Sequence, residues 1–567
     1  MFSARVVRQK MGRDEWLQKI LIAAMVITLF VSVMLPLGDL FSKVFIDETG
    51  HFIGLSNLVH YFSTPALTVS FTNTLYISMV TTVISVTFAF LYAFALTRTA
   101  IRGKGFFRYV ALLPLFAPTM MHGIALTYLF GNQGLVTNGF FGLFEGIKIE
   151  LYGPVGIIIS EVIYTFPQAY LILAASLMFA DYNLYEAAET LGASKTRKFL
   201  TVTLPNVKYG LVSAIFVCFT MSFTDFGAPK VVGGQYNVLA TDVYKHVIGQ
   251  QNMTMGATVG LILILPAILA FIVDRIVERK QNSSITAKSK PYKISPHKMR
   301  DRLYFAYCSL VSAAIFALLI TVVFASMVKV WPYDLSLSLN HFDFSMVAGE
   351  GMEPYWNSLT VAFYSAVIGT VITFMYAYLI EKSRFMKGIR LIGYFLSILP
   401  LALPGLVIGL AYIFFFNNPA NPLNWMYGTI AILILANLVH FYSVPFITAT
   451  SALKKLDREF ELASESMGVP FYKTFLRVTV PMSLPAILEI AVYYFINAMV
   501  TISAVVFLYS ADFKLASVAI VNMDDAGDVA PAAAMSVLIV LTNIVIRIVY
   551  ELVTRRLRKR TEAWQTR

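Results

Sequence analysis

The sequence has little charge and almost no cysteine. Only 13% of its 567 residues are charged, against about 25% in soluble globular proteins, and 58% are hydrophobic. These values exclude a soluble enzyme and a disordered chain. The two cysteines, Cys218 and Cys308, both lie within long apolar stretches, which excludes a disulfide framework and a cysteine-ligated metal centre.

Several motifs of catalysis are absent as well. The segment closest to a nucleotide-binding loop, GASKTRK at 192–198, lacks the second glycine and the Gly-Lys pair that such a loop needs. No His-Glu-x-x-His motif, no paired-cysteine metal motif and no nucleophile elbow occurs. We therefore expect neither an enzyme nor a resident cofactor or metal, and any ATP hydrolysis must come from another subunit.

Long apolar windows dominate what is present. Each is about 20 residues long or more, enough to cross roughly 30 Å of hydrocarbon as a helix. The sequence therefore predicts an all-α polytopic membrane protein with about twelve spans. The windows lie near 17–38, 71–97, 107–130, 152–178, 208–228, 255–276, 303–328, 358–380, 389–416, 428–450, 482–508 and 531–552.

The net charge of +12 is distributed unevenly over the connections. Of the 44 Lys and Arg residues, 38 lie at the two ends of the chain and in every second connection, and only six lie in the others. This alternation follows the positive-inside rule and predicts that both termini are cytoplasmic. It also explains the charge without a nucleic-acid partner, and it fits contact with anionic lipid. The basic N-terminus precedes an apolar run without a cleavage site, which favours a retained first span over a signal peptide.

The chain repeats itself. NTLYISMVTTVISVTFAFLYAFAL from Asn73 matches NSLTVAFYSAVIGTVITFMYAYLI from Asn357, and LLPLFAPTMMHGIAL matches SILPLALPGLVIGLA. The second match pairs prolines with prolines and a glycine with a glycine: Pro114 with Pro400, Pro118 with Pro404 and Gly123 with Gly409. Because each repeat holds an even number of spans, the two six-span halves are expected to be parallel.

The repeat also predicts domain boundaries. The stretch 278–302 is polar, rich in Ser and Lys, and reads as a flexible cytoplasmic linker between the halves. The predicted segments are a leading tail, span and outer loop at 1–67, a first repeated domain at 68–277, the linker, a second leading span and outer loop at 303–352, a second repeated domain at 353–552 and a basic tail at 553–567.

A loop motif occurs once in each half, at 181–207 and 457–481. DYNLYEAAETLGASKTRKFLTVTLP matches DREFELASESMGVPFYKTFLRVTVP without a gap. Each is expected to form a short amphipathic helix that opens after Asp181 or Asp457 and closes at a glycine. A second short helix is expected to stop at Pro205 or Pro481. Such a unit can dock on another protein; the alternative is an interfacial helix that lies on the bilayer.

These loops resemble the EAA loop of type I ABC importer permeases, the binding-protein-dependent inner-membrane components. The resemblance implies that each loop docks as a coupling helix on a cytoplasmic ABC ATPase dimer, and that an extracytoplasmic binding protein delivers the substrate to a bacterial inner membrane. The second loop departs from the pattern at Leu462 and Ser464, which leaves the contact of its Glu461 open. The positions that carry the resemblance are Glu186, Ala187, Ala188, Gly192 and Pro205, and Glu461, Ala463, Gly468 and Pro481.

Ionisable residues within the spans are few, and each is a candidate for the translocation path. A histidine can instead bond a neighbouring carbonyl, and the glutamate of the eleventh span lies close enough to its end to reach the interface. Asn73 and Asn357, at the start of matching spans, are better explained by interhelical hydrogen bonds. The five candidates are His122, Glu161, Asp225, His440 and Glu489.

The fused double form resembles the ferric-iron, thiamine and 2-aminoethylphosphonate importer group. The strings LLPLFAPTMMHGIALTYLFGNQG and TDFGAPKVVGGQYNVLATDVYKHVIGQQNMTMGA look most like the 2-aminoethylphosphonate branch. Ferric iron or thiamine is the alternative substrate. A twelve-helix secondary transporter would not need two coupling loops, and a membrane scaffold without transport would not need proline-interrupted spans in both halves.

Overall fold

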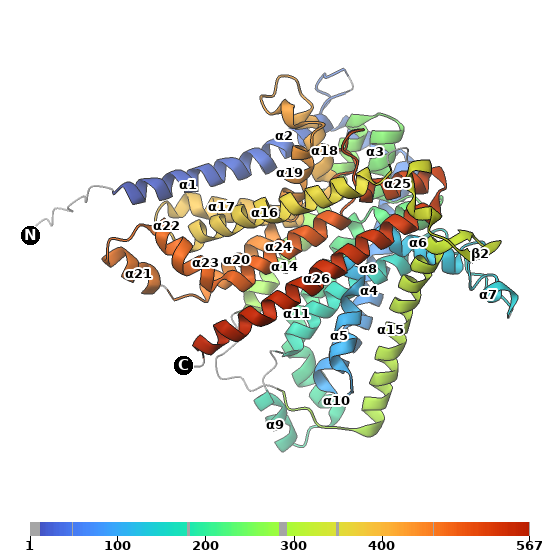
Figure 1. The fold of residues 1–567 in the computed structure, drawn as a ribbon, viewed down its shortest axis with the longest axis horizontal. Coiled ribbons are helices and arrows are strands. Elements are labelled where there is room, and N and C mark those ends of the chain that lie inside the picture. The colour runs from blue at the N-terminus through green and yellow to red at the C-terminus, as the bar shows by residue number, and fades with distance from the viewer. Residues whose placement is uncertain are drawn as a thin grey trace, which may run out of the picture.

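The computed structural model describes residues 12–47, 49–143, 145–178, 182–282, 292–347, 351–457 and 459–565 (Figure 1). These ranges are almost entirely helical, with a single two-stranded antiparallel sheet. The expected all-α fold is confirmed. The central part of the predicted linker, 283–291, lies outside the described residues.

The first part of the chain forms fourteen of the described helices. Short π-helical turns at Phe30–Met34, Phe199–Thr203 and Lys245–Gly249 and a 3-10 turn at Leu113–Phe116 join some of them. The helices are α1 (Arg13–Leu29), α2 (Leu35–Val44), α3 (Ser56–Ser63), α4 (Pro65–Arg98), α5 (Lys104–Leu112), α6 (Thr119–Phe130), α7 (Gly139–Gly142), α8 (Pro154–Met178), α9 (Tyr182–Thr190), α10 (Lys195–Lys198), α11 (Leu204–Thr224), α12 (Gly227–Val232), α13 (Leu239–Tyr244) and α14 (Met253–Asn282).

The second part follows the same order. A small hairpin of β1 (Val328–Val330) and β2 (Asp334–Leu337) comes after its first helix, and 3-10 turns lie at Asn340–Phe342, Phe344–Met346, Leu399–Ala402 and Asn424–Met426, with a π-helical turn at Phe475–Thr479. The helices are α15 (Lys298–Met327), α16 (Glu353–Lys382), α17 (Lys387–Ile398), α18 (Gly405–Phe416), α19 (Ile430–His440), α20 (Ser443–Lys454), α21 (Glu459–Ser466), α22 (Phe471–Thr474), α23 (Val480–Met482), α24 (Leu484–Val500), α25 (Ala516–Ala526) and α26 (Val529–Gln565).

The described helices provide eight to twelve membrane spans. Eight are long and apolar enough to cross a membrane alone, and four further helix pairs bring the number to twelve if each bent pair is one span. The expected number of about twelve therefore holds only with the bent pairs included. Several large apolar side chains on the spans, such as Val83 and Leu310, are 67% and 71% exposed, as lipid-facing residues would be.

Four of the expected spans are not straight helices, and proline is the main cause. The windows 107–130 and 389–416 are bent by 102° and 114°. The residues before Pro118 and Pro404 are extended, with ψ of 141° and 121°, because a residue that precedes proline is pushed out of the helical region. The window 428–450 is bent by 55°. The helix in the window 482–508 lies at 79° to the preceding helix Phe471–Met482 and ends at Val500 rather than at residue 508.

Each half packs its leading helix against the other half. The first helix, α1, lies along α16 and α17, and α2 packs on α18 (Figure 1). Correspondingly, α15 lies against α4, α5 and α6 of the first half. The two halves are therefore exchanged at their leading spans. The domain boundaries expected from the repeat stay a prediction, because this exchange links the segments on either side of them.

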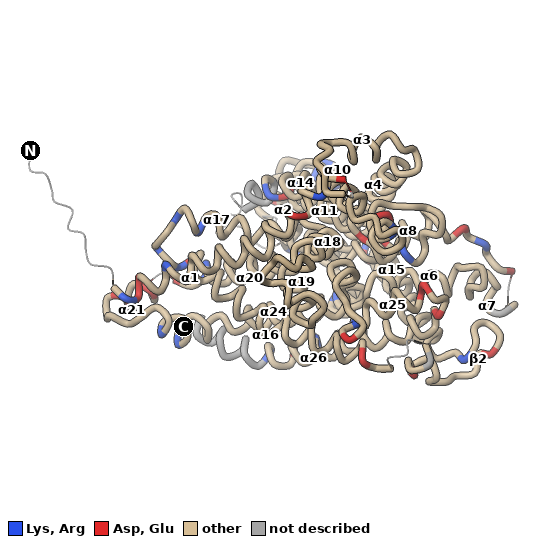
Figure 2. Tube along the Cα trace, turned by 90° about the horizontal axis from the view of Figure 1, so that it is seen from above, with Lys and Arg blue, Asp and Glu red and all other residues tan. Residues whose placement is uncertain are grey.

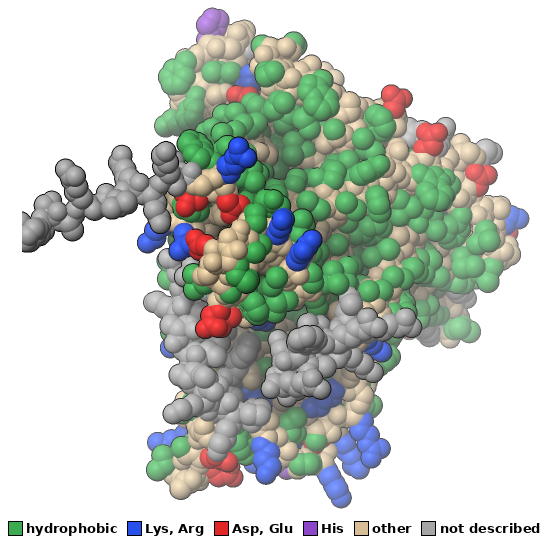
Figure 3. Space-filling model, turned by 60° about the vertical axis from the view of Figure 1, so that its left-hand side comes forward, with side chains coloured by type: hydrophobic (Ala, Val, Ile, Leu, Met, Phe, Trp, Pro, Cys, Tyr) green, Lys and Arg blue, Asp and Glu red, His purple; other side chains and the backbone are tan. Residues whose placement is uncertain are grey.

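Charge and apolar surface separate clearly. Lys and Arg gather at the end of the molecule that carries α1, α17 and the C-terminus (Figure 2). A broad side face is covered by hydrophobic side chains, with charged groups toward its margins (Figure 3). A molecule with such a belt buries its apolar side in hydrocarbon and leaves its charged ends in water.

Candidate translocation cavity and docking loops

A cavity of about 560 Å³ lies between the two halves. Its walls come from α8, α11 and α14 of the first half and from α19, α20 and α24 of the second. Polar side chains from both halves line the cavity: Tyr164, Gln168, Asp225, His440, Tyr493 and Asn497. All of these except Tyr493 also line a smaller adjoining hollow of about 130 Å³.

The cavity extends toward the end of the molecule that carries the two repeated loops. Along α8 its lining residues run from Tyr164 to Ser176, two residues before the helix ends and the first loop begins. On α14 they are Asp274 and Arg275, in the last third of that helix. The opposite end of the cavity, at Asp225 and Ser503, is where the bent spans meet.

Two glycines of the bent spans allow close contacts with neighbouring segments. A methyl group built on Gly123 in α6 would lie 2.8 Å from the Cβ of Val231, and one on Gly409 in α18 would lie 2.9 Å from the carbonyl oxygen of Ala504. Both distances are too short for any residue but glycine. The glycines paired by the sequence repeat therefore occupy the same kind of close contact in both halves.

An ion pair joins the halves beyond this closure. Lys230 of α12 lies 2.6 Å from Asp525 of α25, and its ammonium group also lies over the ring of Tyr244. Burial raises the pKa of the neighbouring Asp524 to about 6; the charge of Asp525 adds to this shift and Lys230 opposes it. A charged contact thus joins the two halves on the side of the molecule away from the repeated loops.

The five predicted path residues are placed differently. Asp225 and His440 line the cavity, one from each half. Glu161 is fully buried against Asp225, and His122 is buried with neither ring nitrogen hydrogen-bonded to any residue that the structure describes. Glu489 is exposed on α24 and does not line the cavity. Their role in a path stays a prediction. Within the described ranges, no three His, Cys, Asp or Glu side chains gather so as to hold a metal ion.

Sequence reasoning missed several lining residues. Tyr164, Gln168, Tyr493 and Asn497 are uncharged, so a search for ionisable residues passes over them. The repeat carried a usable signal, because at the offset of 276 Tyr164 matches His440, which was among the candidates. Positions that match a candidate in the other half are the ones to examine.

The first repeated loop forms the expected helix and turn. Helix α9 ends in a turn in which Gly192 has φ +68°, its N–H bonds the carbonyl of Glu189, and the N–H of Ala193 bonds that of Ala188. This pair of hydrogen bonds is the left-handed glycine cap expected from the sequence. Glu186 and Ala187 are exposed. The expected helix start at Asp181 lies outside the described residues.

The second loop repeats this geometry. Gly468 has φ +67°, its N–H bonds the carbonyl of Glu465, and the N–H of Val469 bonds that of Ser464. At the start of α21, the carboxylate of Asp457 accepts the N–H of Glu459 at 3.2 Å. Two turns with the same conformation, 276 residues apart, place a short exposed helix at the same position of each half.

The expected stop at the prolines holds only in the second half. In the first half, residues Lys195–Thr224 form one span that runs through Pro205, because the π-helical turn before it accommodates the missing N–H. In the second half, the helix ends one residue after Pro481, and the chain bends by 79°. There Pro485 stands where the first half has Tyr209, so a second proline prevents the helix from continuing.

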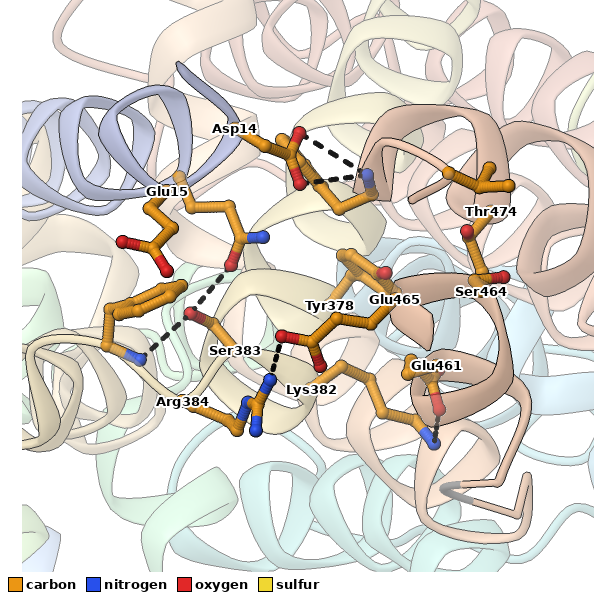
Figure 4. Close-up of a pocket in the computed structure, with 14 residues that line it drawn as sticks. Asp14, Glu15, Tyr378, Lys382, Ser383, Arg384, Glu461, Ser464, Glu465 and Thr474 are labelled. Carbon is orange, nitrogen blue, oxygen red and sulfur yellow. Dashed lines mark hydrogen bonds and ion pairs between the residues drawn. The ribbon is translucent and has the colours of Figure 1, made fainter. Parts of the chain in front are cut away.

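The second loop is tied to both halves (Figure 4). Lys382 at the end of α16 lies 3.4 Å from Glu461, and Arg384 pairs with Glu465. The carboxylate of Asp14, from the exchanged helix α1, accepts the N–H of Phe471 at 3.1 Å. Glu461, whose contact the sequence left open, is thus paired within the chain.

The first loop is held by aromatic rings instead. Arg98 matches Lys382 in the repeat and is 2% exposed. Its guanidinium donates to the carbonyl of Leu177 at 2.6 Å and lies 3.9 Å from the ring centroid of Tyr292. Tyr185, at the position of Glu461, packs on the same group at 5.5 Å. Because Tyr292 precedes α15, this loop too is contacted by a segment of the other half.

Comparison with known proteins identifies the family to which this chain belongs. The family model described as binding-protein-dependent transport system inner membrane component matches residues 85–283 and 382–559. A ferric transport system permease protein of Actinobacillus pleuropneumoniae is 28% identical over 92% of this chain and 76% of its own length. An Fe(3+)-transport system permease protein of Haemophilus influenzae is 25% identical over 90% of this chain and 95% of its own length. With two matched segments that cover more than half of its length, the chain belongs to the family of binding-protein-dependent transport system inner membrane components.

Proposed function

We propose that this ABC importer permease couples to a cytoplasmic ATPase dimer through its two repeated loops. The support is geometric: both loops present a short helix with the same glycine cap, and both leave apolar side chains exposed beside it. Leu191 is 85% exposed in the first loop and Met467 is 72% exposed in the second. Exposed apolar side chains on paired, rigid helices suit docking into a partner's groove. The ATPase would supply the ATP hydrolysis for which this chain has no motif.

We also propose that the loops and both termini face the cytoplasm. The support is the excess of Lys and Arg at that end. An extracytoplasmic binding protein would then deliver the substrate at the opposite end.

Cysteine labelling tests this orientation. Ala526→Cys, at the exposed end of α25, is expected to react with a membrane-impermeant thiol reagent in intact cells, and Lys195→Cys, in the first loop, only after the cells are opened. The native Cys218 and Cys308 are both 0% exposed, so the parent chain is the blank. Labelling of Lys195→Cys in intact cells would reverse the assignment.

For the substrate, we propose 2-aminoethylphosphonate, a small zwitterion. The carrying observation is the cavity, whose lining combines acidic Asp225 and Asp274 with basic Arg275. A wall with both signs of charge suits a solute that carries both an ammonium and a phosphonate group. The resemblance of the bent-span strings to the 2-aminoethylphosphonate branch supports the same choice.

Ferric iron is the second candidate, with thiamine behind it. The specific observation in favour of iron is the similarity to permeases named for ferric transport, which extends over most of this chain. Carboxylate, phenol and imidazole groups of the cavity are also ligands that iron accepts.

An uptake comparison separates the substrates. Deletion of the gene is expected to abolish uptake of labelled 2-aminoethylphosphonate and growth on it as sole phosphorus source, while growth on inorganic phosphate stays normal. A plasmid copy should restore both. Loss of labelled ferric iron uptake alone, with 2-aminoethylphosphonate uptake intact, would assign the importer to iron.

A further inference from the structure

We propose that the adjoining carboxyl groups of Asp225 and Glu161 form a subsite that receives an ammonium group of the transported solute. The inference rests on the proposed function, since it takes the cavity as the path and a small zwitterion as the solute. It names a ligand chemistry for one wall of that path.

Asp225 is fixed at the end of the cavity that lies away from the loops. It follows Thr224, the last residue of α11, and its Oδ2 accepts the backbone N–H of Ala228 at 2.9 Å. The hydroxyl of Thr119 also donates to this carboxylate. The side chain lines both the large cavity and the smaller hollow that continues it. An anchored carboxylate that still faces open space is available to a ligand.

Glu161 adds a second carboxyl group behind the first. It comes from α8, is 0% exposed and lies against Asp225. Apart from the carboxyl group of Asp225, its oxygens meet no hydrogen-bond partner in the described part of the chain. Two carboxyl groups buried side by side are costly to ionise together, so a cation that enters beside the pair would offset that cost.

The second half serves as an internal control for a structural role. At the offset of 276, Thr501 takes the place of Asp225 and Asn437 that of Glu161. Thr501 ends its helix with φ −70° and ψ 136°, and Asp225 does so with φ −69° and ψ 139°. The same turn therefore forms without either carboxyl group. The fold does not require the acidic pair, which points to a ligand.

The basic group of the cavity lies away from the acidic pair. Asp225 lines the end away from the loops, with Glu161 buried behind it, whereas Arg275 lines the part nearer to the loops, next to Asp274. The facing wall at the closed end carries His440 and Asn497 rather than a second acid. A solute with an ammonium group at one end and an anion at the other matches this order.

The test uses the purified full-length chain and three probes: 2-aminoethylphosphonate, ethylphosphonate, which lacks the amine, and ethylamine, which lacks the phosphonate. The readout is the probe concentration that gives half of the maximal rise in thermal stability. In Asp225→Asn and Glu161→Gln, this concentration is expected to rise at least about 10-fold for 2-aminoethylphosphonate and for ethylamine, because each variant loses a charge-assisted hydrogen bond to the ammonium group. For ethylphosphonate it is expected to stay unchanged.

Two further variants keep the test decisive. Asp225→Thr copies the residue that makes the same turn in the second half, so it should fold and show the same loss. Asp39→Asn, which changes an acidic residue of α2 outside the cavity, should behave as the parent chain.

Equal amine responses in the parent and in Asp225→Thr would overturn the proposal. Stabilisation of the parent by ferric citrate but not by ethylamine would overturn it in favour of a metal. Because ethylamine binding is measured without transport, a failure of 2-aminoethylphosphonate uptake is distinguished from a failure of this subsite.

Discussion

Replacing Gly192 and Gly468 by aspartate together is expected to leave the chain in the membrane but to lower ATP-driven uptake about 10-fold or more. Both glycines have a left-handed backbone, with φ of +68° and +67°, which costs other residues roughly 1 kcal/mol each. A Cβ at either position would meet no atom within 4 Å, so no clash within the chain adds to this cost. Most of the loss should come from a new carboxylate on each docking surface, which must be desolvated without a partner.

The measurement is co-purification of the ATPase together with substrate uptake. Gly103→Asp is the matched control, because Gly103 also has a left-handed backbone, at φ +72°, with open space around it, but lies outside both loops. It is expected to keep normal uptake. Wild-type ATPase yield and uptake in the double variant would contradict the docking role of the loops.

Substituting Gly123 and Gly409 by alanine together is expected to destabilise the protein by about 2–6 kcal/mol, since overpacking typically costs about 1–3 kcal/mol per site. The added methyl groups would lie 2.8 Å from the Cβ of Val231 and 2.9 Å from the carbonyl oxygen of Ala504. Neither neighbour is the end of a flexible side chain, so the short helices themselves must move apart. These helices close the cavity at the end away from the loops.

Thermal unfolding of the purified chain measures this effect. The control is Gly260→Ala in α14, where the new methyl group would meet side chains at 3.8 Å and 3.9 Å, an ordinary contact distance. Because alanine also favours the helix over glycine, that variant should be at least as stable as the parent. If the double variant unfolded at the same temperature as Gly260→Ala, the close packing at Gly123 and Gly409 would not contribute to the stability of the protein.

The exchange of leading helices bears on how the halves work together. The second loop is contacted through Asp14 by a helix that begins the first half, and Tyr185 of the first loop packs against Tyr292, in the segment that precedes α15. Each loop is therefore in direct contact with a segment that begins one of the halves. These contacts connect two halves that the sequence repeat presents as separate domains.

Much of the local structure was predictable. The glycine caps at Gly192 and Gly468 follow from a glycine that ends a short polar helix, and they formed as expected. The breaks before Pro118 and Pro404 are a local effect of proline too, although the windows around them were expected as single spans. The bend after Pro481 depends on the additional Pro485. This proline lies beyond the matched loop segments, which end at Pro205 and Pro481, so the comparison of the two loops does not include it.

By itself the sequence determined the helical class, the order of the apolar segments and the two repeated loops, because these depend on apolar length, charge and residues that are close in the chain. Only the tertiary structure decided which spans exchange between the halves and which residues line the cavity. The physical reason is that a helix in lipid is apolar on every face, so its pattern does not mark the side that faces the protein interior. Tyr164 and His440 line the same cavity although 276 residues separate them, and Glu489, equally suggestive in the sequence, is exposed on its helix.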